Sequence, residues 1–402
     1  MSQKPLEGIR VIDLTRVLAG PFCTMVLKNL GAEIIKIESP LTGDDSRQFG
    51  PFIDDDPNRS AYFISVNSGK KSIVIDLKNP EGKAVLNDLI KVSDVLMENF
   101  RPGTLERLGF SDSYIKNLNP KIIHTTASGF GYSGPESQKP AYDSIIQALS
   151  GIMSITGTEA GETVRVGTSI SDIVTGLYSA IGIISALFRR DKTGEAARID
   201  VAMLDSTVSV LENAIARYQV FDKNPVPLGS RHPSITPFET FTTKDSEIII
   251  AAGNDKLFAA ACKVIGKPEL ISDDRFISNI LRTKHQQQLK EEIDTLTCLQ
   301  TSAYWLEKLH KKKVPCAKVN NMQDLFEYKQ LQERNMILPV DEQRGFKISG
   351  NPVKFMNEPE SQNIAKTPDL GEHTAVILED LLGYSKEKVQ KLLNIKAVSQ
   401  AD

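Results

Sequence analysis

The chain has 402 residues, of which 40% are hydrophobic and 25% are charged, proportions that are ordinary for a globular protein. Its 48 basic and 51 acidic residues give a formal net charge of −3, so it lacks the basic excess typical of proteins that bind nucleic acids or anionic membranes. We therefore expect neither of these partners, and the length predicts two or three domains.

The first half of the chain alternates short β-rich runs with helical patterns. Strands that alternate with helices form βαβ units and a parallel sheet covered on both faces. The sequence therefore predicts the α/β class, with a large Rossmann-like domain and a mostly parallel sheet. The expected strands are 9–14, 33–38, 72–77, 94–100 and 121–130, and the expected helices are 21–31 and 80–93.

A very apolar stretch at 173–188 predicts a long helix. It is shorter than the roughly 20 residues that a membrane span needs. Asp172 and Arg189 flank it closely, so we expect a buried core helix. A strand and a helix running towards Phe221 follow it.

The composition changes after Phe221. Residues 222–242 carry several prolines and glycines and are typical of an interdomain connection. A hairpin with a Lys-Asp turn is expected at 240–255, followed by charged helices, then β-rich loops and a short helical tail. We predict that 222–325 form a small inserted α+β domain with its linkers, and that 1–221 and 326–402 form the large domain.

The pattern offers no signal for export, disulfides or metal binding. Residues 1–14 have no basic segment followed by a long apolar run and a cleavage site, so we expect a cytoplasmic protein. The four cysteines lie far apart without CxxC spacing, which predicts reduced thiols. The five histidines are too scattered to predict a metal cluster.

Several common catalytic motifs do not occur. No GxGxxG follows the first strand, where the turn reads LTRVLAGP (14–21), which argues against ordinary dinucleotide binding. GxxxxGK[ST] does not occur, which argues against a P-loop nucleotidase. The GxSxG and HExxH motifs are also missing.

Asp172 is a candidate nucleophile because it directly precedes the apolar helix. A carboxylate beside a buried helix is partly stripped of water, which raises its nucleophilicity, and N–H groups at the helix start can stabilise an oxyanion. A carboxylate at a helix start can equally act as an N-cap, although Ser169 and Ser171 are also available for capping. The pattern alone leaves both roles open.

Basic and amide residues near predicted strand ends form a second candidate group. They lie in NSGKKS (67–72), in ENFRPG (98–103) and at Arg107. Sheets of α/β proteins bind ligands at strand ends, and lysine and arginine there suit a phosphorylated ligand. The alternative is a solvated rim of surface charges.

The ordered blocks of this sequence resemble the family III CoA-transferases, which include formyl-CoA transferase and carnitine CoA-transferase. The resemblance covers nearly the whole chain. It is carried by LTRVLAGPFCT, LGAEIIKIESP, GDDSR, NSGKKSIVIDLKNPEGK, DVLMENFRPGTLERLG, ASGFGYSGP, AYDSIIQALSG, SISDIVTGLYSAIGIISALFRRDKTGEAARIDVAMLD and IIIAAGND. The blocks RVLAGPF, GDDSR and SRHPSITPFETF are similar to the succinyl-CoA:dicarboxylate branch.

The resemblance implies which residues form the site. The family's catalytic aspartate falls on Asp172. Ser39 replaces an arginine of formyl-CoA transferase, and AAGND (251–255) replaces its tetraglycine loop, which weighs against formate and oxalate as substrates. The family's CoA-contacting loops fall on Leu18, Ala19, Ile75, Asp76, Leu77, Lys78, Asn99, Phe100, Arg101, Arg107, Pro140, Ala141, Tyr142 and Asp143.

The resemblance also implies the reaction. CoA moves from an acyl-CoA, here succinyl-CoA, to a free carboxylic acid, here a dicarboxylate, through an aspartyl anhydride and an aspartyl-CoA thioester. It implies no cofactor beyond CoA itself, and an interlocked homodimer. Arg47, Arg165, Arg231 and His232 are candidates for binding the distal carboxylate of the acceptor, although each can equally be a surface ion pair.

Three alternative functions stay open: a formyl-CoA:oxalate-type transferase, an α-methylacyl-CoA racemase and an inactive CoA-binding scaffold. A racemase needs two acid/base groups on opposite sides of its substrate. The racemases that resemble this chain pair the aspartate with a histidine in a Gly-His-Asp stretch, which here reads Ala141-Tyr142-Asp143. The intact sequence around Asp172 argues against an inactive scaffold.

Overall fold

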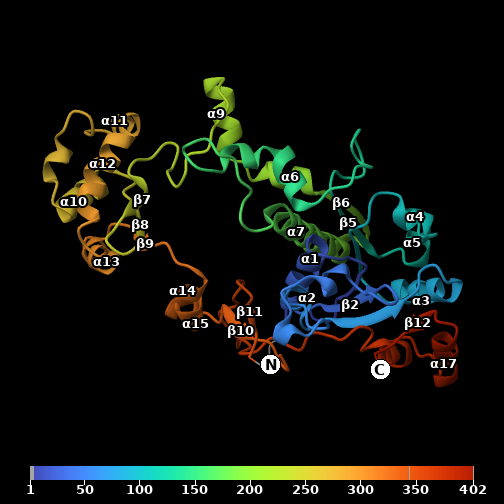
Figure 1. Ribbon diagram of the computed structural model, residues 1–402. Helices are drawn as coiled ribbons and strands as arrows, with labels where there is room; N and C mark the ends of the chain where they lie inside the picture. Colours follow the sequence, from blue (N-terminus) through green and yellow to red (C-terminus); the bar gives the residue numbers. More distant parts are fainter. Residues whose placement is uncertain (1–3, 344, 402) are drawn as a thin grey trace. The chain divides into compact units, whose positions relative to one another are not determined.

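A computed structural model describes residues 4–343 and 345–401, which form two compact units (Figure 1). The first unit comprises Met1–Ile152, Arg165–Ala216 and Gln330–Asp402. The second comprises Met153–Val164 and Arg217–Lys329.

The first unit contains a seven-stranded sheet in the order β12-β3-β2-β1-β4-β5-β6. All neighbouring strands are parallel except β12, which pairs antiparallel with β3 at one edge. The strand order therefore reverses direction between β1 and β4, as in doubly wound folds, and the predicted mostly parallel α/β sheet is confirmed. The strands are β1 (Arg10–Asp13), β2 (Glu33–Glu38), β3 (Lys71–Ile75), β4 (Val95–Glu98), β5 (Ile123–Ser128), β6 (Ala197–Ala202) and β12 (Val398–Ser399).

Successive residues of the central strands pack on opposite faces of this sheet. Ile12 and Ile35 join a core that includes residues of α3, whereas Val11 and Ile34 join a core that includes α1 and α7. Burial on both faces explains why these strands read as continuous apolar runs. The helices of this part are α1 (Ala19–Asn29), α2 (Ala61–Asn67), α3 (Pro80–Lys91), α4 (Thr104–Arg107), α5 (Asp112–Leu118), α6 (Asp143–Ser150), α7 (Ile170–Thr193), α8 (Met203–Ser209) and α9 (Asn213–Phe221).

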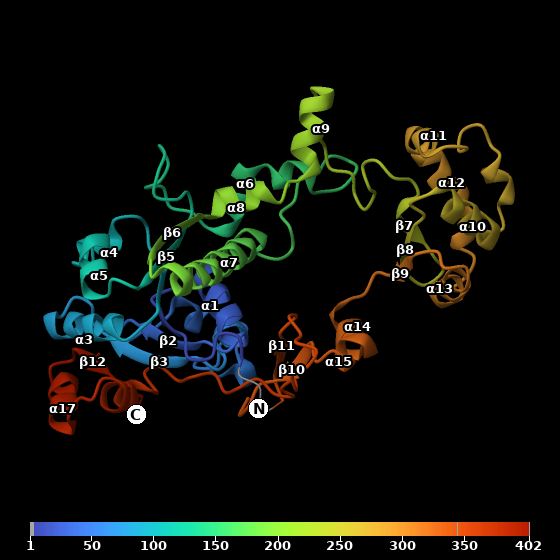
Figure 2. The ribbon, with the colours of Figure 1, turned by 180° about the vertical axis from the view of Figure 1, so that it is seen from behind.

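The C-terminal segment returns to the first unit. Leu378 and Leu392 add to the core on the α3 side of the sheet, and Figure 2 shows α17 and β12 beside α3 and β3. The elements of this segment are α15 (Lys329–Glu333), β10 (Ile337–Pro339), β11 (Lys347–Ser349), α16 (Thr374–Val376), a π-helical turn (Ile377–Leu381) and α17 (Lys386–Asn394).

The second unit has its own small antiparallel sheet, in the order β7-β8-β9. Phe241 and Ile248 from this sheet pack with Phe258, Trp305 and other buried apolar residues into a separate core. The predicted hairpin corresponds to β7 and β8. The elements are β7 (Phe238–Thr242), β8 (Glu247–Ala251), α10 (Asp255–Ile265), α11 (Asn279–Lys284), α12 (Gln286–Thr297), α13 (Ser302–Lys311), β9 (Cys316–Lys318) and α14 (Met322–Glu327).

Several helix boundaries differ from the predicted ones, including the ends of α1, α3 and α7. Helix α1 begins at Ala19 rather than at 21, because Pro21 lies in the first turn, where no N–H partner is needed. Helix α7 begins at Ile170 rather than at 173. The helix expected to run to Phe221 is broken into α8 and α9, and Glu212 between them has a φ of 34°.

Helix α7 is long and apolar enough to cross a membrane by length and composition, and it alone passes that test within 4–343 and 345–401. Half of its most apolar window is buried, and the helix packs against α1, β5 and β6. A Cβ added at Gly176 would lie 2.8 Å from the carbonyl oxygen of Ala19, so only glycine permits this approach of α1 and α7. This packing agrees with the predicted core helix.

Candidate active site

The candidate site lies at the crossover between β1 and β4. These parallel strands are neighbours, and their carboxyl ends lead into residues 14–18 and 99–103. Doubly wound sheets bind ligands in the crevice at such a point, because the connections on either side leave in opposite directions. The strand order therefore places both loops where the resemblance predicts CoA contacts.

A pocket of about 190 Å³ at this crossover brings together nine of the fifteen residues predicted to be catalytic or to contact CoA. Asp172, from the first turn of α7, lies in its lining together with predicted CoA-contacting residues of three loops. The predicted residues in this lining are Leu18, Ala19, Asn99, Phe100, Arg101, Pro140, Ala141, Tyr142 and Asp172.

A second pocket, of about 450 Å³, collects the remaining predicted loop after β3. Its lining includes the four residues 75–78 and Ser39, the position where this chain departs from formyl-CoA transferase. Arg16 and Phe100 line both pockets, so the two cavities adjoin. Together they place residues from the ends of β1, β2, β3, β4 and β5 along one continuous region of the first unit.

Asp172 is a half-buried carboxylate without a compensating partner. Burial, and then the negative charge of Asp143, raise the pKa of Asp172 to about 7. Its carboxylate makes no hydrogen bond or ion pair with any residue of 4–343 or 345–401. The ionised form is therefore destabilised and reactive, as a nucleophile requires.

Capping does not explain Asp172, because another residue satisfies the start of α7. The side chain of Ser169, at the N-cap position, makes no cap hydrogen bond, and the buried hydroxyl of Ser171 has no partner in the described part of the chain. Instead, the carboxylate of Asp143 accepts a hydrogen bond from the backbone N–H of Ser171 at 2.9 Å. This bond from α6 also accounts for the earlier start of α7.

Asp143 is not among the residues that line the pocket. It is buried, and it also accepts a hydrogen bond from Nε2 of Gln147 at 2.7 Å. The resemblance predicted a CoA contact at this position. In the structure, its carboxylate bonds the start of α7 and acts electrostatically on Asp172.

Two titratable residues near the site were not identified from the sequence. Burial raises the pKa of Tyr62, on α2, to about 12, and the charges of Asp172, Asp44 and Asp143 add to this effect. Burial raises the pKa of Glu98, at the end of β4, to about 7. No sequence motif marks Tyr62, whereas Glu98 stands in the ENFRPG block.

Two predicted arginines lie outside both pocket linings. Arg107 donates a hydrogen bond to the hydroxyl of Thr104 at 2.8 Å within α4. Arg47 donates through Nε and Nη2 to the two carboxylate oxygens of buried Glu38, both at 2.7 Å, and its guanidinium stacks on Phe63. These contacts favour a structural role for Arg47.

The other candidates for acceptor binding lie on other segments. Arg231 pairs with Glu159 at 3.0 Å, and His232 stacks on Phe238 with ring centroids 5.4 Å apart, all within the second unit. Arg165, in the first unit, is exposed and donates to the carbonyl of Val166.

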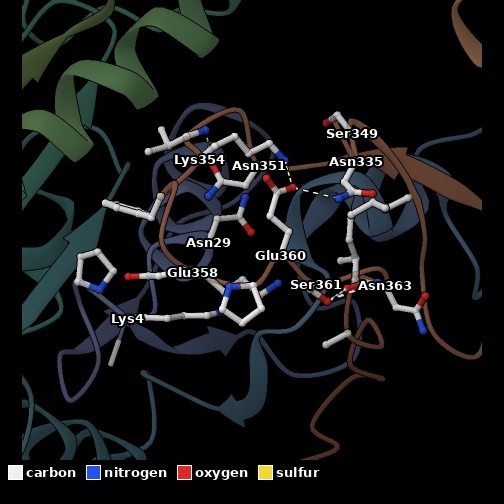
Figure 3. A pocket seen from close by; sticks show the side chains of 18 residues that line it. Lys4, Asn29, Asn335, Ser349, Asn351, Lys354, Glu358, Glu360, Ser361 and Asn363 are labelled. Atoms are coloured by element: carbon white, nitrogen blue, oxygen red, sulfur yellow. Dashed lines mark hydrogen bonds and ion pairs between the residues drawn. The ribbon is translucent and has the colours of Figure 1, made fainter. Parts of the chain in front are cut away.

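A further cavity of the first unit, of about 280 Å³, shares no lining residue with the two pockets at the crossover. Figure 3 shows Glu360 in its middle, where it accepts hydrogen bonds from Lys354 and Asn335. Across 4–343 and 345–401, the histidines, cysteines and acidic residues form no cluster suited to a metal ion.

Comparison with known proteins identifies the family. The model for CoA-transferase family III matches residues 6–374. This chain belongs to that family. It is 41% identical over 377 residues to acetyl-CoA:oxalate CoA-transferase of Acetobacter aceti, covering 94% of this chain and 95% of that one. It is 38% identical over 400 residues to human succinyl-CoA:glutarate CoA-transferase, covering 99% and 90%.

A solved structure of the family shares the fold. A CAIB/BAIF family protein from Brucella suis is 36% identical to this family III chain, with a TM-score of 0.85, and the match covers 94% of this chain and all of that one. The predicted enzyme class is therefore confirmed: the chain is a CoA-transferase, whose substrates are thioesters of CoA.

We expect the carboxyl group of Asp172 to lose its proton near pH 7 rather than near 4, because burial and Asp143 both disfavour its charge. Infrared difference spectra of the wild type minus Asp172→Asn, recorded from pH 4 to 9, measure this midpoint. The variant Asp143→Asn keeps an oxygen that can accept from Ser171 but removes the charge, so the midpoint should fall. An unchanged midpoint would contradict electrostatic coupling of the two carboxylates.

Proposed function

We propose that this CoA-transferase moves CoA from succinyl-CoA to a free dicarboxylic acid, with Asp172 as the covalent nucleophile. The observation that carries the nucleophile assignment is the half-buried, unpartnered carboxylate of Asp172 in the pocket at the β1/β4 crossover. The substrates are inferred from relatives. Proteins 38% and 34% identical to this chain are named for transfer from succinyl-CoA to glutarate and to mesaconate.

The first half of the proposed reaction transfers the donor acyl group to Asp172. A carboxylate oxygen of Asp172 attacks the thioester carbonyl carbon, the C–S bond breaks, and CoA leaves as a thiolate. The product is a mixed anhydride between Asp172 and the donor acid. The thiolate then attacks the aspartyl carbonyl carbon, which releases the donor as a free carboxylate and leaves an aspartyl-CoA thioester.

The second half reverses these steps with the acceptor. The acceptor carboxylate attacks the aspartyl thioester and expels the thiolate, forming a second anhydride. The thiolate attacks the acceptor carbonyl carbon, so that acceptor-CoA forms and Asp172 returns as a carboxylate. Each intermediate preserves the activation of the original thioester, so the proposed chemistry needs no cofactor beyond CoA, although water must be kept from the anhydrides.

CoA is proposed to occupy the two adjoining pockets. Leu18, Phe100, Tyr142 and their neighbours would contact the end of CoA that reaches Asp172. The loop 75–78 would contact the other end in the second pocket, where Lys78 supplies a positive charge for phosphate. Arg231 and His232 stay proposed ligands of the acceptor's distal carboxylate.

The second compact unit is proposed to be the small inserted domain, and the chain to form an interlocked homodimer. Support for the dimer comes from large apolar side chains that a single chain leaves exposed on α6 to α9. Exposed apolar surface of this extent is typical of an interface. These residues are Ile145, Leu149, Leu177, Tyr178, Ile181, Phe188, Val208, Val210, Ile215, Tyr218, Val220 and Phe221.

Asp172→Ala should lower turnover on the order of 10⁴-fold or more, because the covalent route is lost. Hydroxylamine added during turnover should modify Asp172 of the wild type, as mass spectrometry of the digested protein would show. Asp191→Asn, an exposed position at the far end of α7, is the matched control and should behave as the wild type. Retained turnover in Asp172→Ala, or failure to capture an aspartyl adduct, would contradict the nucleophile.

The same preparation separates the transferase from the racemase. In deuterated water without an acceptor acid, the α-proton of a 2-methylacyl-CoA should not exchange, because Tyr142 replaces the second proton-transfer group. Rapid exchange would favour the racemase.

A donor-by-acceptor screen tests the substrates. We expect kcat/KM to be highest for succinyl-CoA with glutarate or mesaconate, and about 10- to 100-fold lower with monocarboxylates, which lack the second charged group to be bound. Acetyl-CoA, formyl-CoA and oxalate belong in the screen, since a relative at 41% identity is named for oxalate. Equal rates with acetate and glutarate would contradict a dicarboxylate site.

Light scattering should give about twice the chain mass of 44.4 kDa. Ile181→Glu places a charge on the exposed apolar surface of α7 and should weaken the dimer, whereas Val92→Glu, at an exposed apolar position after α3, should not. A monomeric mass for the wild type at micromolar concentration would refute the proposed assembly.

A further inference from the structure

The loop between β1 and α1, residues 14–18, is held at Thr15, Arg16 and Val17 by side chains from other segments. Asn99 makes two of these contacts: its Oδ1 accepts from the N–H of Arg16 at 3.0 Å, and its Nδ2 donates to the carbonyl of Arg16 at 2.8 Å. The side-chain amide of Asn99 therefore bonds both the N–H and the carbonyl of Arg16, as the backbone of a neighbouring strand would. Thr15 is held in the same manner, since its carbonyl accepts from Nζ of Lys36 at 2.8 Å.

Val17 in this loop has a φ of 68°. A β-branched side chain disfavours this left-handed conformation, which persists only where surrounding contacts impose it. Oδ1 of Asp44 accepts from the N–H of Val17 at 3.0 Å and so supplies one such contact. The two contacts to Arg16 from Asn99 fix the residue before it.

Asp44 is itself rigidly placed. It is buried, and its Oδ2 lies 2.7 Å from Nζ of Lys36. Its Oδ1 also accepts from the backbone and the hydroxyl of Ser46. Burial opposes ionisation, but Lys36 and these hydrogen bonds hold the pKa of Asp44 well below its usual range. The carboxylate is therefore a fixed, charged acceptor for the N–H of Val17.

The loop leads directly into the pocket. Val17, Leu18 and Ala19 line it together with Asp172, and α1 begins at Ala19 without a side-chain cap. The conformation of Val17 therefore determines where the first turn of α1 and its uncapped N–H groups lie relative to Asp172. A displacement of about 1 Å in such a site can lower a rate about 100-fold.

We propose that Asn99 and Asp44 are positioning residues for CoA transfer, which hold Val17 in its left-handed conformation and so place the start of α1 beside Asp172. This inference rests on the proposed function. It gives Asn99 a different role from the CoA contact that the resemblance implies, because both ends of its amide are already bonded to Arg16.

The test compares two asparagines that each clamp backbone. Asn99→Ala should lower kcat about 10- to 100-fold with a much smaller change in the KM for acyl-CoA. Asn119→Ala is the matched control, because half-buried Asn119 donates to the carbonyls of Ile90 and Ser93 at 2.9 and 2.8 Å, away from both pockets. The control should lose similar stability and keep the wild-type kcat.

The variant Val17→Gly distinguishes a positioning role of Asn99 from a role in stability alone. Glycine adopts the left-handed conformation freely, so the loop no longer depends on its clamps. Asn99→Ala should therefore lower kcat less in the Val17→Gly background than in the presence of Val17. Equal losses in both backgrounds would overturn the proposal, and so would an Asn99→Ala variant that raises KM with kcat intact.

Hydroxylamine capture separates this proposal from the function on which it rests. If the wild type yields no adduct at Asp172, the proposed function fails and the positioning role fails with it. If the adduct forms in the wild type, and forms more slowly in Asn99→Ala, positioning is supported. Asp44→Asn is a second variant, but Asn99→Ala decides the question because its side chain lies outside the buried charges.

Discussion

Four buried charges beneath the candidate site set the backbone path on which it depends. Asp13 and Lys70 lie 3.2 Å apart, Lys36 and Asp44 lie 2.7 Å apart, and all four side chains are buried. Burial alone would raise the pKa of Asp13, but Lys70 and Lys36 hold it below its usual value. Such a cluster tolerates little change, because removing one charge strands its partner in the protein interior.

The compensated charge of Asp44 contrasts with the uncompensated carboxylate of Asp172. Asp44 and Asp172 are far apart in the sequence of the first unit, and burial opposes ionisation of both. Asp44 receives a lysine and several N–H and O–H donors, so it is charged and inert. Asp172 receives none of these and has a second carboxylate, Asp143, nearby. The fold thus compensates the charge of buried Asp44 and leaves half-buried Asp172 without a compensating partner.

Sequence patterns predicted the parallel sheet because strands buried on both faces are uniformly apolar and alternate with helices. They singled out Asp172 from its place before an apolar helix, but left its role open. The pattern could not show that Asp143, in α6, accepts from Ser171 and so relieves Asp172 of capping, because that contact joins residues of different helices. Only the family resemblance supplied a chemistry.

Other features of the site depend on contacts between distant residues, which no sequence motif marks. Arg47 is a candidate acceptor ligand because of its charge, and the sequence could not show that its guanidinium is bonded to the buried carboxylate of Glu38. The left-handed conformation of Val17 could not be predicted from the sequence either, because valine is among the residues that adopt this conformation least often. Both features arise from buried charges, whose partners come from distant parts of the chain.

The pairing of β12 with β3 has a consequence for biosynthesis. Val398 pairs with Ile75, so one edge of the sheet stays open until a segment far later in the sequence has left the ribosome. Through that interval the apolar face that later receives Leu378 and Leu392 is also uncovered. An unpaired strand beside uncovered apolar surface readily joins another chain. Until residues 398–399 have been made, β3 therefore needs shielding, and its pairing with β12 removes that hazard.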